Sequence, residues 1–414
     1  MKKMFVFWMS IGVSLMVFLL SFKEIQAQTK SPMVKKAPEY ILIGNAISLT
    51  GPYSMGAKIT QIPNYDMWIE EVNAKGGIFV KEYNKRIPLK LIRYDDKSDI
   101  GTMVRLVEKL CVEDKVHFLL PPWGTAMHFA IAPVANKYGY PIIGPTVSSE
   151  KLRELVPKYP NFFAILNQPR QQAPALVDLL VELGVKKVAV VFVEDLHGIE
   201  WAGGLAPEIG RKGLELALLK SYPLGSADLS PLIKQAMALN VEAFIAVSYP
   251  ADTMLLTKQA IELNFNPPLF YCGVGTAFPS YRDSLGSKTI EGVMGHGAWN
   301  PRVPYAGAKE YFEKHKKRWG TEPDRWGSAF AYASVQVLEQ AIEKAGTLDR
   351  KKVQHIIATE TFDTIVGPVK FIDGFNIQSP GEIGQWQAGE FEVVAAKEKR
   401  TAKPIFPKPV WPSK

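Results

Sequence analysis

The sequence contains only two cysteines, Cys111 and Cys272, in 414 residues. Two cysteines so far apart do not make the disulfide framework that stabilises small secreted domains. Cys111 falls on the face of a predicted helix and Cys272 at the end of a predicted strand, so we expect two buried free thiols. The fold must then depend on its hydrophobic core, for which a chain that is 47% hydrophobic has ample material.

Familiar catalytic and metal-binding motifs are also missing. The sequence has no Gly-x-Ser-x-Gly nucleophile elbow, no phosphate-binding loop with its lysine and no His-Glu-x-x-His pair. Its six histidines are widely spaced, without the separations typical of metal ligands. These absences argue against an enzyme, and we expect no metal and no organic cofactor.

Charge is spread along the chain, and long apolar runs are confined to its start. The formal net charge is +8, but no arginine-rich stripe is interleaved with aromatic residues, which argues against nucleic acid as a partner. Lys2 and Lys3 precede an almost continuous apolar run over residues 4–20, and the small residue Ala27 follows it. This pattern predicts a signal peptide over residues 1–27 and a periplasmic location. The run is also long enough for an uncleaved membrane anchor.

The rest of the chain alternates short apolar runs with amphipathic stretches of helical length. This alternation is typical of parallel sheets covered by helices on both faces. More than eight strands is many for one open sheet, so the predicted fold class is α/β with two doubly wound parallel-sheet lobes. Strands are expected at residues 40–46, 89–95, 116–120, 140–144, 162–166, 187–193, 214–222, 243–247 and 269–272.

Three local expectations follow from residue types. Residues 56–74 read as one helix, which Gly76-Gly77 ends. The adjacent strand residues Asp95 and Asp96 point to opposite faces, so we expect each to accept hydrogen bonds from loop amides or a nearby helix start rather than to share a proton. The proline-rich stretch 403–414 is expected to lie extended on the surface.

Polar loops at the ends of three predicted strands are the main functional signal. They cover residues 121–126, 145–150 and 248–252. In open α/β sheets, ligands bind beyond the carboxyl ends of the strands. The first two loops offer hydroxyls, including Thr125 and Ser148, and main-chain N–H groups near a helix start, a combination that suits a carboxylate. The same two hydroxyls could equally be ordinary helix caps.

Five motifs, in this order and spacing, resemble the periplasmic solute-binding proteins of branched-chain amino acid ABC transporters, the Leu/Ile/Val-binding family. The resemblance covers about residues 40–394. The motifs are Leu49-Thr50-Gly51-Pro52, the stretch from Val72 to Ile78, Tyr94-Asp95-Asp96 with Asp99, the stretch from Asp363 to Pro368, and Gln385-Trp386.

The resemblance implies two α/β lobes that are joined by a three-segment hinge and clamp a ligand between them. Lobe 1 is expected to comprise residues 38–165 plus 298–370. Lobe 2 is expected to comprise residues 166–297 plus 371–400, and a proline-rich tail follows at 401–414.

The function that the resemblance implies is an extracytoplasmic receptor of an ABC importer, which binds a small amino acid or related carboxylate and presents both lobes to a membrane permease. The same fold would also serve a ligand-sensing module that partners a membrane kinase or chemoreceptor. A third alternative is an extracytoplasmic enzyme, such as a hydrolase, that uses the same cleft.

The resemblance also implies site residues. In the family, hydroxyl residues of two lobe 1 loops hold the ligand carboxylate, and these positions match Thr125 and Ser148, with help from the main chain of Thr146. An aromatic residue of lobe 2 that faces the ligand matches Tyr249.

Three positions depart from the family pattern. Met55 stands where the family often has a tyrosine in the Gly-Pro loop, and His197 where it often has a tyrosine before glycine. The family's acidic residue for the ligand ammonium falls in the loop where this chain has Gly273-Val274-Gly275. A buried ammonium without a carboxylate is costly, which favours an aromatic acid, a short-chain acid or an amide unless another acid, such as Asp252, replaces the missing one.

The expected pocket is rich in aromatic and adaptable side chains. Trp123, Met55, His197 and Tyr249 would line it, although each of them could instead be packing at the edge of a lobe.

Overall fold

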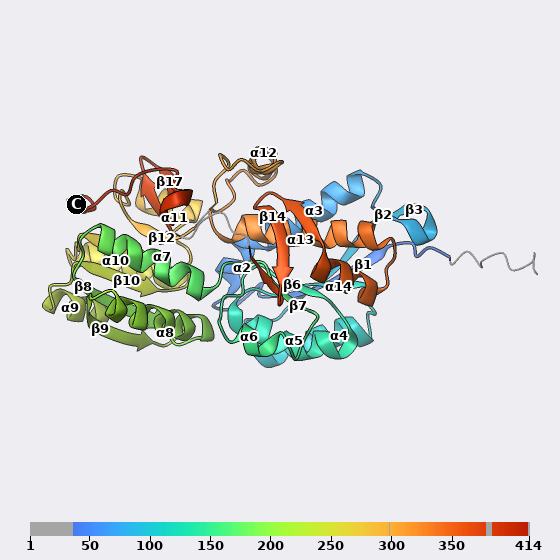
Figure 1. Cartoon of the computed structure of the whole chain (residues 1–414), viewed down its shortest axis with the longest axis horizontal. Coiled ribbons are helices and arrows are strands. Elements are labelled where there is room, and N and C mark those ends of the chain that lie inside the picture. The colour runs from blue at the N-terminus through green and yellow to red at the C-terminus, as the bar shows by residue number, and fades with distance from the viewer. Residues whose placement is uncertain (1–35, 298, 378–382, 413–414) are drawn as a thin grey trace, which may run out of the picture.

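The computed structural model describes residues 36–297, 299–377 and 383–412. Two α/β lobes lie side by side along the long axis of the molecule (Figure 1). The expected α/β fold with two lobes is confirmed. Within the described residues, no helix is both long and apolar enough to span a membrane. The predicted signal peptide, residues 1–27, lies outside the described residues.

Lobe 1 contains two main sheets. The first has the order β4-β1-β5, with all strands parallel, and the second has the order β13-β14-β15-β7-β6. A small antiparallel hairpin, β2–β3, stands apart from both sheets. The strand bounds are β1 Ile41–Ile47, β2 Ile78–Val80, β3 Lys85–Ile87, β4 Leu89–Asp95, β5 Phe118–Leu120, β6 Ile142–Gly144, β7 Phe162–Ala164, β13 Thr361–Thr364, β14 Gly367–Ile372 and β15 Phe375–Asn376.

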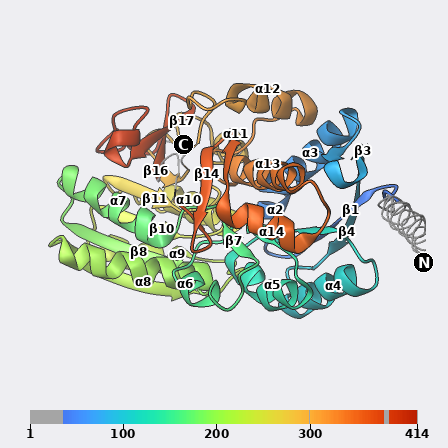
Figure 2. The same cartoon turned by 45° about the vertical axis from the view of Figure 1, so that its right-hand side comes forward.

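Helices from two distant parts of the sequence cover lobe 1. The long helix α13 is buried along most of its length and packs against α2, α3 and α14, although it follows lobe 2 in the chain (Figure 2). The helices are α2 Ser54–Thr60, α3 Ile62–Ala74, α4 Ile100–Val112, α5 Thr125–Tyr138, α6 Leu152–Leu155, α12 Ala308–Trp319, α13 Gly327–Ala345 and α14 Arg350–Thr359, with a 3₁₀ turn, η1, at Lys81–Tyr83.

The single helix expected over residues 56–74 is in fact two helices. The break falls at Gln61, between α2 and α3. Pro63 lies in the first turn of α3, where its missing N–H group costs nothing, whereas the same proline inside a continuous helix would remove a hydrogen bond.

Lobe 2 is built on one sheet of seven strands in the order β17-β16-β12-β11-β10-β8-β9. Five neighbouring strands of this sheet, β9, β8, β10, β11 and β12, are parallel, and β16 and β17 add an antiparallel edge. The strands are β8 Lys187–Val193, β9 Glu215–Tyr222, β10 Ala243–Val247, β11 Leu269–Cys272, β12 Met294–His296, β16 Ile383–Gln387 and β17 Glu390–Ala395. The helices are α7 Pro169–Glu182, α8 Leu196–Arg211, α9 Ser230–Ala238, α10 Pro250–Glu262 and α11 Pro279–Leu285, with a 3₁₀ turn, η2, at Lys397–Lys399.

The chain changes lobe three times. It leaves lobe 1 after β7, returns after β12 and leaves again between β15 and β16. Because Phe375 of β15 pairs with Ala164 of β7, the chain stays with lobe 1 beyond residue 371. The last connection includes residues 378–382, which lie outside the described residues.

Both cysteines are buried free thiols, as expected, and burial raises the pKa of each to about 12.

The expectation of an extended surface tail is wrong at Lys408 and Trp411, which are both buried. The Trp411 indole donates a hydrogen bond to the Phe265 carbonyl at 2.7 Å and packs edge-on against Phe270 at 5.4 Å. Trp411 therefore packs into lobe 2, although most of the described tail residues remain exposed or half-buried.

Candidate functional site

A small cavity lies where the carboxyl ends of the strands of the two lobes meet. It holds about 10 Å³ of free space, roughly the room of a single water molecule. The lobes are thus closed over it. Lobe 1 and its hinge contribute Trp123, Gly124, Thr125, Thr146, Ser148, Leu166 and Trp326, and lobe 2 contributes His197, Tyr249 and Val274.

The lobe 1 wall is built on the start of α5. Gly124 has a φ of 94°, a conformation that favours glycine, and it turns the chain from β5 into the helix. The first turn of α5 leaves main-chain N–H groups without partners inside the helix, and the helix dipole there favours negative charge. His128 Nδ1 donates to the Gly124 carbonyl at 2.8 Å and holds the turn in place. Burial lowers the pKa of His128 to about 4, so this histidine adds no charge near neutral pH.

Hydrogen bonds connect the two loops that carry the three predicted hydroxyl residues of this wall. The Ser148 amide donates to Thr125 Oγ1 at 3.2 Å, and the Gly124 amide donates to Thr146 Oγ1 at the same distance. The Ser148 hydroxyl donates to the Asn167 carbonyl at 3.2 Å. Thr125, Thr146 and Ser148 are all buried. The two loops thus present hydroxyls and a helix start at one point, an arrangement able to hold an anion.

The lobe 2 wall is a stacked pair of rings. His197 lies in the first turn of α8 and Tyr249 precedes α10, and their rings are nearly parallel with centroids 5.6 Å apart. Burial lowers the pKa of His197 to about 4, although the charge of Asp195 and the main chain of Ser148 act in the opposite direction. A neutral imidazole therefore faces the cavity.

Trp123 is the meeting point of the aromatic residues. Its ring lies 5.1 Å from Tyr249, 5.7 Å from Tyr53 and 6.5 Å from Trp326, measured between ring centroids. Tyr53 and Tyr249 are themselves nearly perpendicular at 5.6 Å. These contacts join aromatic rings of both lobes around the cavity.

Asp195 bridges the two lobes behind these rings. The Tyr53 hydroxyl of lobe 1 donates to Asp195 Oδ2 at 2.5 Å. The Tyr249 hydroxyl and the His197 amide, both of lobe 2, donate to Asp195 Oδ1 at 2.8 Å. Burial first, and then the negative charge of Asp195, raises the pKa of both tyrosines above its usual range.

The loop that carries Tyr53 is anchored by the acidic pair at the end of β4. Asp95 accepts hydrogen bonds from the amides of Leu49 and Thr50, and Asp96 accepts from the Ser48 hydroxyl at 2.6 Å. The expectation that both carboxyls bind loop groups is confirmed. Burial raises the pKa of Asp96 to about 6.

Six of the seven predicted site residues line this one cavity, and Met55 does not. Met55 is 45% exposed, because α2 begins at Ser54 and turns Met55 to the outer face. Tyr53 precedes that helix and points inward to Asp195. A tyrosine is thus present in the Gly-Pro loop, at an earlier position than the one considered from the sequence.

Sequence reasoning also missed Asp195 and Trp326. Asp195 had a weak local signal, since an aspartate between a strand and a helix is a good helix cap, and its carboxylate does accept from the His197 amide at the start of α8. The ligand-binding role of all these residues remains a prediction.

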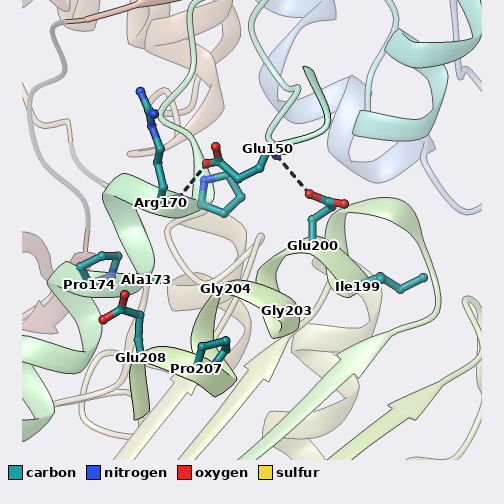
Figure 3. Close-up of a pocket in the computed structure, with 11 residues that line it drawn as sticks. Glu150, Arg170, Ala173, Pro174, Ile199, Glu200, Gly203, Gly204, Pro207 and Glu208 are labelled. Atoms are coloured by element: carbon teal, nitrogen blue, oxygen red, sulfur yellow. Dashed lines mark hydrogen bonds between the residues drawn. The ribbon is translucent and has the colours of Figure 1, made fainter. Parts of the chain in front are cut away.

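Beside the cavity, the loop that carries Ser148 is tied to lobe 2 (Figure 3). The Arg170 amide of α7 donates to the Glu150 carboxylate at 2.9 Å, and the Glu150 amide donates to Glu200 of α8 at 3.1 Å. Lys151 pairs with Glu200 at 3.7 Å. These contacts border an open groove of about 520 Å³ between α7 and α8. The contacts thus connect the loop of Ser148 to lobe 2 on one side of the cavity.

Titratable clusters suited to a metal ion are absent from the described ranges, 36–297, 299–377 and 383–412. The residues that line the cavity offer hydroxyls, main-chain amides and aromatic faces.

Comparison with known proteins places the chain in a family. Residues 41–390 match the sequence model of the family described as periplasmic binding protein. The chain therefore belongs to this family. The Leu/Ile/Val-binding protein homolog 7 of Brucella suis is 22% identical over 373 residues, which cover 86% of this chain and 91% of that protein.

Two solved structures share the fold. A solute binding protein of an ABC transporter from Rhodopseudomonas palustris, in complex with 3,4-dihydroxy benzoic acid, has a TM-score of 0.75 and 19% identity, with 90% of this chain and 99% of that chain covered. A branched-chain amino acid transporter substrate binding protein from Streptococcus pneumoniae, in complex with isoleucine, has a TM-score of 0.72 and 18% identity, with coverage of 89% and 100%.

Proposed function

We propose that this chain is an extracytoplasmic solute-binding receptor of an ABC importer that closes its two lobes on a small carboxylate. One observation carries the proposal: the start of α5 and the hydroxyls of Thr125, Thr146 and Ser148 converge on a cavity whose opposite wall belongs to the other lobe. Buried N–H and hydroxyl donors at a helix start favour an anion. The two relatives of the same fold that hold isoleucine and 3,4-dihydroxy benzoic acid support a carboxylate as the shared group.

Binding and release follow from the two-lobe geometry. A cavity with room for about one water molecule cannot admit an amino acid or an aromatic acid, so the lobes part for entry and exit. A ligand that contacts both walls stabilises the closed form by its differential affinity for that form. The closed form is then the one that a membrane permease reads, and no bond of the ligand is made or broken.

A thermal stability screen tests this function. A ligand that binds only the folded state raises the melting temperature by mass action, by the equivalent of about 2.7 kcal/mol at 100 times its Kd. We expect a rise with one or more small carboxylates, and a much smaller rise with the matching primary amide or alcohol, because neither carries the negative charge. The lack of any rise across amino acids, aromatic acids and short-chain acids would contradict the proposal, as would equal rises with acid and amide.

A separate experiment tests the expectation that the protein does not convert its ligand. Ligand that is recovered after prolonged incubation and analysed by mass spectrometry should be unchanged. Stoichiometric or catalytic conversion of the bound ligand would instead identify an enzyme.

A further inference from the structure

His197 lines the cavity and carries a ring nitrogen that no protein group pairs. It is 4% exposed, and across the part of the chain that the structure describes its Nε2 atom has no hydrogen-bond partner. The indole Nε1 of Trp123, which lines the same cavity and is 1% exposed, also lacks a partner among those residues. Such atoms are rare in folded proteins, because a buried polar atom without a hydrogen bond costs free energy.

Unpaired nitrogens continue behind the cavity into lobe 2. The His197 ring lies 5.8 Å from the His296 ring and 6.4 Å from the Trp201 ring, measured between centroids, and both neighbours are buried. Within the described ranges, His296 Nε2 and Trp201 Nε1 have no hydrogen-bond partner either. The Tyr271 hydroxyl and His296 Nδ1 share a hydrogen bond at 2.8 Å. The lobe 2 wall is therefore backed by polar atoms as well as by apolar ones.

The structural contacts of His197 do not require its Nε2 atom. The stacking of its ring on Tyr249 depends on the shape of the ring, and a phenyl ring would stack there as well. Its hydrogen bond to Asp195 uses the main-chain amide and not the imidazole. Among the contacts of the described residues, Nε2 thus has no structural role, which leaves it for a group that enters the cavity.

The size of the cavity determines what a ligand must provide. The closed cavity has room for about one water molecule, which can pair with polar atoms of the lining. A ligand that fills the cleft displaces such a water molecule and must replace its hydrogen bonds, or it leaves buried nitrogens unpaired. A hydrocarbon side chain offers no hydrogen bond and cannot meet this requirement.

The charges around His197 favour an uncharged partner. Burial lowers the pKa of His197 to about 4, so the imidazole is neutral near pH 7, and an indole carries no charge. Asp195, which accepts from the His197 amide, places a negative charge beside the ring and disfavours a second carboxylate. A hydroxyl or an amide can pair with a neutral imidazole without burying a further charge.

We infer that His197 selects a ligand with two separate polar groups: a carboxylate for the lobe 1 wall, and an uncharged hydroxyl or amide for the imidazole, with the Trp123 N–H as a second partner. This inference rests on the proposed function, because it assumes that a carboxylate occupies the lobe 1 wall. It narrows the ligand to carboxylates that carry a neutral hydrogen-bonding group at a distance from the carboxylate.

Calorimetric titration at pH 7 with pairs of carboxylates that exchange a hydroxyl for a methyl group tests the inference. The pairs are L-threonine with L-valine, 4-hydroxybutanoate with pentanoate, and 4-hydroxyphenylacetate with 4-methylphenylacetate. If none of them binds, the pair is built from the tightest carboxylate of the thermal screen and its hydroxyl or methyl counterpart. We expect the wild type to prefer the hydroxyl member of at least one pair by about 10-fold or more, because the methyl member leaves a buried nitrogen unpaired.

A substitution at His197 locates the preference. His197→Phe keeps a ring that can stack on Tyr249 and removes both ring nitrogens. It should weaken binding of the hydroxyl member about 10-fold or more and leave the methyl member within about 3-fold, so that the preference disappears.

His315→Phe is the matched control. His315 is also buried, with an Nε2 atom that has no partner among the described residues, but it belongs to α12 and does not line the cavity. This variant should keep the wild-type preference. Circular dichroism checks that both variants fold, and the wild-type comparison needs no variant at all.

Failure of the inference and failure of the function give different results. Equal or tighter binding of the methyl member in every pair that binds, or an unchanged preference in His197→Phe, would overturn the role of His197 and leave carboxylate binding by the lobe 1 wall intact. Loss of the preference in His315→Phe as well would also overturn it. If no carboxylate of any kind binds, both the proposed function and this inference fall.

Discussion

The carboxyl group of Asp252 makes the stability of lobe 2 depend on pH. Burial raises its pKa to about 6, above the ordinary value of about 3.9 in an unfolded chain. The folded state thus holds this proton more tightly, so stability falls as pH rises from about 4 to 6 and stays lower above that window.

We expect the Asp252→Asn variant to remove this dependence. It should be more stable than the wild type above pH 6, by at most about 3 kcal/mol for a shift of about two pKa units, and equal to it below about pH 4. Urea unfolding between pH 4 and 8 measures the difference. A variant that is less stable than the wild type at pH 8 would show that the ionised carboxylate is stabilising instead.

How far single residues can be predicted from the sequence depends on how local their contacts are. That Thr125 and Ser148 lie at one cavity could be predicted, because each follows a strand end by a short loop and ligands bind beyond such ends. The Tyr53–Asp195 hydrogen bond joins residues 142 positions apart across two lobes, and only the closed fold brings them together. Met55 lies outside the cavity because a helix start shifted by a residue or two changes which side chain faces inward.

At the scale of elements, α2 is held against the cavity by a glycine. A Cβ atom at Gly56 would lie 2.3 Å from the indole ring of Trp123, which lines the cavity and contacts both Tyr53 and Tyr249. A Gly56→Ala substitution must therefore displace either α2 or the Trp123 ring.

We expect Gly56→Ala to lower the free energy of unfolding by about 1–3 kcal/mol, the usual cost of overpacking, and to weaken ligand binding as well. Gly203→Ala is the matched control, because Gly203 lies inside α8 with no atom within 4 Å of its Cβ position. The control should gain about 0.5–1 kcal/mol from helix propensity. Thermal melts compare the stability of the two variants, and calorimetry compares their affinity for ligand. A Gly56→Ala protein that binds ligand as tightly as the wild type would show that Trp123 can move freely.

Elements with a strong periodic pattern were predictable, and short or exposed ones were not. The long strands of both lobes lie close to their expected positions, because buried strands have a distinct apolar spacing. The β2–β3 hairpin was not expected, because its three-residue strands are partly exposed, unlike the fully buried β5, β6 and β7 of the same length. The break between α2 and α3 depends on Pro63, whose effect in a first turn differs from its effect in a helix interior.

At the scale of the whole molecule, the cavity and the contacts of the C-terminal tail lie at opposite ends of the lobe 2 strands. The cavity lies at the carboxyl ends of the strands, whereas the tail packs near the start of β11, where Lys408 N–H donates to the Pro268 carbonyl and Trp411 contacts Phe270. Strand alternation predicted two lobes, but no local pattern indicated that a proline-rich tail would join a core.

Trp411→Ala should therefore lower stability and leave affinity unchanged. The loss of a buried tryptophan costs about 3–5 kcal/mol. Chemical unfolding and ligand titration measure the two quantities on the same sample. If the variant binds ligand more weakly while still folded, the tail influences the cleft and the separation of the two ends does not hold.

Calorimetric titration of Thr125→Ala and Ser148→Ala with the tightest-binding carboxylate is the most direct test of the central claim, that the lobe 1 wall holds the ligand's carboxylate. Each variant should lose about 1–3 kcal/mol of binding free energy, as expected for a hydrogen bond to a charged group. Thr359→Ala, which removes an exposed hydroxyl that is bonded only to its own helix, should bind like the wild type. Wild-type affinity in both Thr125→Ala and Ser148→Ala would contradict the claim.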